Sequence, residues 1–174
     1  MGQERGMFPL EARLGTVLGL LELVVAYGGR ADLALIAREF RATLDDILSA
    51  SKAAEQLGLL NIVDGEGVVT PLGIRVSRSL AKGKKKILRE QLPTLEPFAT
   101  AINLSREKRE GFTTEDLAAA LAKDERLATY GENMDALHEL IVDWMLYTEL
   151  LNYDGDSRVF TSKTRKPHQP SSSE

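Results

Sequence analysis

Hydrophobic residues recur at spacings of three and four over much of this chain, a pattern that predicts amphipathic helices. In the first half it predicts three helices, at about 10–25, 33–40 and 44–57. Gly28 and Gly29 are expected to end the first helix, and Asp32 to cap the second. Thr43 and Asp46 predict a capping box for the third, in which each side chain pairs with a backbone N–H of the other residue.

Two segments carry a different pattern and resemble each other. The first runs from Leu60 to Thr70 around Asp64-Gly65, and the second from Leu151 to Thr161 around Asp154-Gly155. Each predicts a short apolar strand, an Asp-Gly turn and a second strand, because glycine takes the positive φ that a tight turn needs. Each hairpin follows a predicted helix. The expected fold is therefore mainly α with two small β-hairpins, in a tandem winged-helix architecture.

The remaining elements follow from turn and cap residues. Pro71 suits the first turn of a helix that runs to about Leu80, and 81–86 is expected to form an exposed basic junction. Helical pattern resumes at 87–109, where Pro93 and Pro97 bend or break it.

Later in the chain, Thr113 and Asp116 predict a capping box, and 133–151 the longest helix, with Trp144 in its buried stripe. Asp135, Glu139 and Asp143 form an acidic stripe on the same helix. The expected organisation is a first winged-helix domain at 8–82, a second at 83–162 and a disordered tail at 163–174.

Composition narrows the class of protein. The 174 residues are 43 % hydrophobic and 28 % charged and include no cysteine, which excludes disulfides and thiolate metal sites. No apolar run approaches the ~20 residues of a membrane-spanning helix, and the first residues lack the pattern of a signal peptide. No membrane insertion is expected, and the cytoplasm is the expected location. The net charge of −4 divides into +2 as far as Leu92 (13 basic, 11 acidic residues) and −6 beyond it (9 basic, 15 acidic).

Four stretches of the chain resemble one protein family, the C-terminal AAA-associated domain. They are Gly28–Leu33 with Ile36-Ala37, then Ala53–Leu59, then Val69–Gly73, and finally Trp144–Leu150 with Tyr153-Asp154. The resemblance extends from about Leu14 to Phe160. Members of this family are appended to the ATP-binding subunits of nitrate/sulfonate/taurine-type ABC importers, and sometimes stand alone. The family tends to have Gly-Arg after the tryptophan, where this chain has Met145-Leu146.

A basic run is the first candidate for a binding site. Seven cations fall within 15 positions: Arg75, Arg78, Lys82, Lys84, Lys85, Lys86 and Arg89. They could contact phosphates of nucleic acid or an acidic partner. The alternative, which we favour, is a solvated helix end and linker, since cations are favoured at the C-terminus of a helix.

The predicted third helix argues against reading of DNA sequence. It would be the recognition helix of a DNA-binding winged helix, but Asp45 and Asp46 lie at its N-terminus and would oppose phosphates. Lys52 is its single basic residue, and no arginine is present for bidentate contact with guanine. This helix favours contact with protein.

No catalytic, cofactor-binding or metal-binding residues are expected. Gly83-Lys84 lacks the preceding glycine and the following Ser or Thr of a P-loop. His138 and His168 have no second ligand at metal-binding spacing, and Glu149 with Asp154 is better explained by a turn than by an acid/base pair. A separate set of aromatic residues, Trp144, Tyr147 and Tyr153, fits a core better than a stacking platform.

The sequence thus predicts a non-catalytic regulatory or interaction module without a cofactor. Its resemblance implies an ABC-type ATPase subunit as partner, and a second copy of itself, as a homodimer, is the other expected partner. The alternative is a winged-helix transcriptional regulator that would use Lys82, Lys84, Lys85, Lys86 and Arg89 on DNA phosphates. Nucleic acid is the less favoured ligand.

Overall fold

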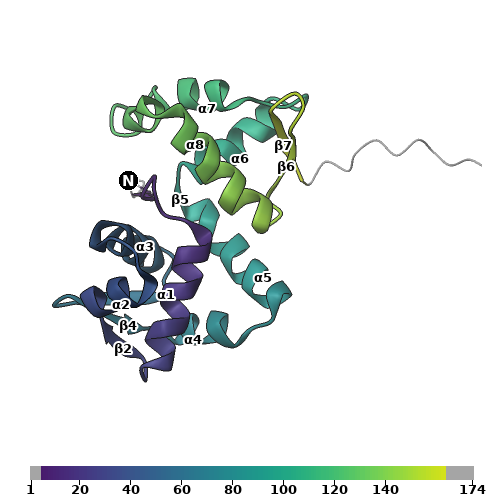
Figure 1. The fold of residues 1–174 in the computed structure, drawn as a ribbon. Coiled ribbons are helices and arrows are strands. Elements are labelled where there is room, and N and C mark those ends of the chain that lie inside the picture. Colours follow the sequence, from purple (N-terminus) through teal and green to yellow (C-terminus); the bar gives the residue numbers. More distant parts are fainter. Residues whose placement is uncertain (1–4, 164–174) are drawn as a thin grey trace, which may run out of the picture.

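The computed structural model describes residues 5–163, and the chain there is mainly helical with three small sheets. Two halves lie one above the other, with helix α5 beside their junction (Figure 1). This confirms the expected mainly α class with small β-hairpins. The predicted tail lies outside the described residues except for Lys163. Within the described residues, no helix is long and apolar enough to cross a membrane.

The first half is built from four helices and one three-stranded sheet. The elements are α1 (Leu14–Ala26), β2 (Arg30–Asp32), α2 (Leu33–Phe40), α3 (Leu44–Gln56), β3 (Leu60–Val63), β4 (Glu66–Val69) and α4 (Pro71–Arg78). The sheet order is β2-β4-β3, and both pairings are antiparallel. Asp64 and Gly65 both have positive φ between β3 and β4, so the predicted Asp-Gly turn is confirmed here.

Side-chain caps fix several of these helix starts. The Asp32 carboxylate accepts hydrogen bonds from the backbone N–H groups of Ala34 and Leu35, at 2.8 and 3.2 Å. Thr43 Oγ1 accepts from the N–H of Asp46 at 3.1 Å. The reciprocal bond from Asp46 is absent among the described residues, so the predicted capping box is only half formed.

The prediction that residues 81–86 form a linker between the halves is wrong. Residues 81–86 form the first turns of helix α5 (Ala81–Gln91). Beyond it the prolines break the predicted 87–109 helix into η1 (Leu92–Thr94), the short strand β5 (Leu95–Glu96) and α6 (Phe98–Glu107). Strand β5 pairs in parallel with β1 (Gly6–Met7), which brings the start of the described chain beside the second half.

The second half consists mainly of helices and ends in the second hairpin. After α6 come α7 (Thr114–Leu121), η2 (Ala128–Glu132), α8 (Met134–Ile141), the π-helical segment η3 (Val142–Leu146), β6 (Leu151–Asp154) and β7 (Val159–Ser162). The Thr113–Asp116 capping box is confirmed with both bonds present. The predicted single helix at 133–151 is instead α8 continued by the π-helical segment.

The two hairpins share their pairing but not their turn. Ile62 pairs with Gly67 in the first and Tyr153 with Phe160 in the second. The second strand also pairs on its other side, Ala31 with Gly67 and Phe112 with Phe160. In the second hairpin Asp154 is the last strand residue, and Gly155–Arg158 form a four-residue loop. The predicted two-residue Asp154-Gly155 turn is therefore wrong for the second hairpin.

One continuous core joins the halves. The Phe8 ring packs edge-on against Phe98 and Trp144, at centroid distances of 5.0 and 4.9 Å. Trp144 is fully buried, and its indole N–H donates to the carbonyl oxygen of Ala12 at 2.9 Å. The segment before α1 therefore belongs to the packing of the second half.

Candidate interaction surfaces

The exposed face of α3 combines leucines and acids. Leu44 and Leu48 lie one turn apart and are 47 % and 43 % exposed, high values for side chains of this type. Asp45, Asp46 and Glu55 are also exposed, and Lys52 is the only basic residue in the helix. An apolar and acidic face of this kind suits a protein surface better than a phosphate backbone.

A shallow groove lies beside this face, between α2 and α3. Leu35, Ala42 and Leu44 line it, with Asp32 and Arg38 at its polar edges, and it encloses about 560 Å³. Leu44 belongs both to this groove and to the exposed face of α3, so the two adjoin each other.

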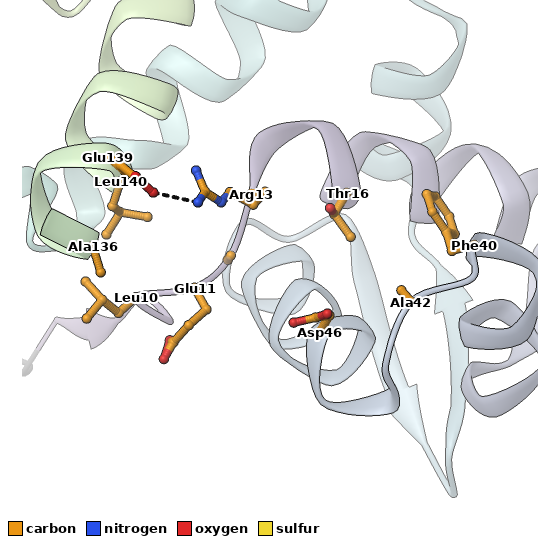
Figure 2. Close-up of a pocket in the computed structure, with 11 residues that line it drawn as sticks. Leu10, Glu11, Arg13, Thr16, Phe40, Ala42, Asp46, Ala136, Glu139 and Leu140 are labelled. Carbon is orange, nitrogen blue, oxygen red and sulfur yellow. Dashed lines mark hydrogen bonds and ion pairs between the residues drawn. The ribbon is translucent and has the colours of Figure 1, made fainter. Parts of the chain in front are cut away.

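A second groove lies on the surface where the two halves meet (Figure 2). It encloses about 460 Å³, with Leu10 and Leu140 on one side and Phe40 on the other. The Asp46 and Glu11 side chains both border it. Such walls and carboxylates suit an apolar ligand that carries positive charge.

Two contacts near this groove, an ion pair and a hydrogen bond, also join the halves. Arg13 donates to Glu139 at 2.5 Å, and both side chains are more than half exposed. The backbone N–H of Leu14 donates to the Asp143 carboxylate at 2.8 Å. Two of the three residues in the acidic stripe, Glu139 and Asp143, therefore contact the start of α1. The sequence around the stripe does not indicate these contacts.

The basic run splits into engaged and free residues. Lys84 Nζ donates to the carbonyl oxygen of Ser79 at 2.6 Å. Lys85 Nζ lies 3.5 Å from a Glu149 carboxylate oxygen and 5.5 Å from the centre of the Tyr147 ring. Arg89 Nε donates to the carbonyl oxygen of Thr148 at 2.7 Å. These three cations hold α5 in place.

The other two predicted contact residues, Lys82 and Lys86, are exposed. Neither side chain has a hydrogen bond or ion pair within residues 5–163. Of the five predicted contact residues, these two keep their charged groups available to a ligand.

Two further residues considered in the sequence, His138 and Asp154, form hydrogen bonds within the protein. His138 Nδ1 is 2.7 Å from Thr114 Oγ1, and its Nε2 is 3.2 Å from the Tyr153 hydroxyl. Burial lowers the pKa of His138, assisted by the positive charge of Arg158. Asp154 accepts from the Ser157 hydroxyl at 2.8 Å, and this bond lowers the pKa of Asp154. No three His, Cys, Asp or Glu side chains gather as a metal site in the described part of the chain.

Comparison with known proteins gives a family but no individual relative. No curated protein matches the chain, and no solved structure does. The sequence model of the C-terminal AAA-associated domain matches residues 34–154. That range includes three of the stretches that carry the resemblance, 53–59, 69–73 and 144–150, whereas Gly28–Leu33 lies before it. The range covers more than half of the sequence. The chain belongs to the C-terminal AAA-associated domain family.

Proposed function

We propose that this chain is a non-catalytic accessory module that acts by protein contact on an ABC-type importer ATPase in the cytoplasm. Membership of the AAA-associated family supports a link to an ATPase. We propose further that each half is a winged helix. The succession of helix, strand, two helices and hairpin in the first half supports this, as does the matching third-strand pairing at Phe112.

The face of α3 carries the proposal. In a winged helix this is the helix that DNA-binding members place in the major groove. Here its exposed positions are leucines and carboxylates, and Leu44 and Leu48 expose nearly half of their surface to water. Burial of such leucines against a partner is favourable by about 25 cal/mol per Å² of apolar area, whereas the carboxylates repel phosphates.

Calorimetric titration of the full-length chain with a purified importer ATPase subunit tests this function. Leu48→Asp places a charge at the centre of the proposed contact and is expected to weaken binding at least about tenfold. The matched control is Val63→Asp, because Val63 is similarly exposed (41 %) but lies on the first hairpin. Absence of binding by the unaltered chain, or equal binding by both variants, would reject the proposed contact.

A second copy of this chain is the other candidate partner for the same face. Sedimentation equilibrium of the full chain measures self-association directly, and Leu48→Asp would then shift the mass toward that of the monomer. A dimer that is insensitive to this substitution would show that the copies do not associate through the α3 face.

DNA binding is the alternative function, and the basic run favours it. The case for DNA binding is weaker because Lys84, Lys85 and Arg89 already pair with other groups of the protein. Fluorescence anisotropy with a mixed-sequence duplex, at low and physiological salt, decides between the two. Binding at micromolar or lower concentration with a steep salt dependence would favour the DNA regulator.

A further inference from the structure

Leu80 is the most exposed large hydrophobic residue among those described, at 86 %. It lies in the turn between α4 and α5, where it precedes the first residue of α5 and makes no side-chain cap. An apolar side chain held almost wholly in water at a helix–helix turn contributes little to the protein core. Its exposure leaves it available for contact with a partner.

Free cations flank Leu80 on both sides along the chain. Arg75 and Arg78 lie in α4, and Lys82 and Lys86 in α5. All four are exposed, and within residues 5–163 none of their charged groups has a hydrogen bond or an ion pair. They differ in this from the engaged cations of the same run, so the two helices that meet at Leu80 carry four available positive charges within seven positions of it. We call these five residues the basic turn.

One lysine of the basic turn, Lys82, lies at a helix end where the local electrostatics disfavour a cation. Cations are favoured at a helix C-terminus and disfavoured at its N-terminus, where the helix dipole is positive. Arg75 and Arg78 lie in the last turn of α4, which suits them. Lys82 is the second residue of α5, whose first turn has no acidic residue. An anion beside Lys82 would relieve this repulsion.

We infer that the basic turn is a contact site for an anionic phospholipid surface. Lipid phosphates would pair with the four cations, while Leu80 enters the boundary between headgroups and acyl chains. A nucleic acid backbone would pair with the same cations but offers nothing for the apolar side chain that lies between them along the chain. Leu80 therefore favours a lipid surface over DNA.

Vesicle sedimentation with the full-length chain tests this inference. Phosphatidylcholine vesicles with added phosphatidylglycerol are expected to retain the protein, with binding that falls as salt rises, and pure phosphatidylcholine vesicles are not. Two variants should each lower retention at least about fivefold: the charge reversal Lys82→Glu/Lys86→Glu, and Leu80→Ser. Both should fold, because glutamate at position 82 suits the first turn of α5, Lys86 is exposed, and serine is a good N-cap.

Matched controls separate the basic turn from general charge. Arg106→Glu/Lys123→Glu changes the net charge equally at exposed positions elsewhere and should leave retention unchanged. Leu48→Asp should also leave it unchanged, so failure of the proposed ATPase contact and failure of this inference are distinguishable. Equal retention on both vesicle types would overturn the inference. So would tight DNA binding that needs the lysines but not Leu80, which would identify a nucleic acid surface.

Discussion

The Asp143 carboxylate, in the second half, accepts a 2.8 Å hydrogen bond from the backbone N–H of Leu14, the first residue of α1. Helix α1 has no side-chain cap from its own N-cap residue, Arg13, and no acidic residue in its first turn. A residue 129 positions away in sequence therefore supplies the capping group. The negative charge of this group also suits the positive end of the helix.

Replacement of Asp143 by alanine is expected to lower the free energy of unfolding by about 1–2 kcal/mol, the usual effect of losing an N-cap. Asp143→Asn keeps an acceptor oxygen without the charge and should cost less. Urea unfolding followed by circular dichroism measures both. If Asp143→Ala were as stable as the unaltered protein, the bond between the halves would have no energetic role.

Two glycines in helices should respond in opposite ways to alanine. A Cβ at Gly73 would lie 2.2 Å from the carbonyl oxygen of Leu59, which the backbone cannot easily vacate. We expect Gly73→Ala to destabilise the protein by at least about 1–3 kcal/mol. A Cβ at exposed Gly15 meets nothing within 4 Å, so Gly15→Ala should stabilise by up to about 1 kcal/mol. Thermal unfolding of the pair compares them directly, and equal shifts would contradict the packing around Gly73.

His138 should make stability depend on pH near neutrality. Burial is the main cause that lowers its pKa in the folded protein below the ordinary 6.5, and Arg158 adds to it, while Glu115, Asp135 and Glu139 oppose it. The unfolded chain thus binds the proton more readily. The contribution of His138 to stability is fully present above pH 6.5 and is lost as pH falls through that value toward the folded pKa.

The free energy of unfolding, measured by urea at a series of pH values on either side of 6.5, checks this dependence. His138→Gln retains hydrogen-bonding capacity without a titrating group, so the slope in this range should disappear in the variant. An unchanged slope would place its origin in another group.

The basic run should separate into a structural and a free part. Arg89→Ala removes the 2.7 Å bond to the Thr148 carbonyl oxygen and should lower the free energy of unfolding by about 1–3 kcal/mol, as expected for a hydrogen bond to a charged group. Lys86→Ala removes an exposed side chain and should change it by less than about 0.5 kcal/mol. Urea unfolding of both variants tests the division, and similar losses would contradict it.

Local signals in the sequence predicted much of the fold. Asp32, Thr43 and Thr113 each cap a helix as expected, since a cap formed by the N-cap residue itself involves only the next three residues. The prediction for 81–86 was wrong because a run of lysines has the composition of a solvated linker. The chain continues as a helix there because Ile87 and Leu88 are buried.

The candidate surfaces were less accessible to sequence reasoning. The groove of Figure 2 brings together residues from near the start of the chain, from α3 and from α8, so its members share no local pattern. Leu80 did have a signal, an apolar residue between two basic stretches at a predicted helix end. Its exposure depends on how α4 and α5 meet, which spacing alone does not determine.

The position of Phe8 has a consequence for folding. Because its ring fills the space between Phe98 and Trp144, the second half is complete only when the segment that precedes α1 is in place. The same segment leads directly into α1 of the first half, and its Met7 carbonyl oxygen accepts a hydrogen bond from Gln56 in α3. Neither half should therefore melt independently, and the intact chain is expected to show one cooperative transition, whereas a fragment beginning at α4 would leave Trp144 without its neighbour and collapse without a fixed core.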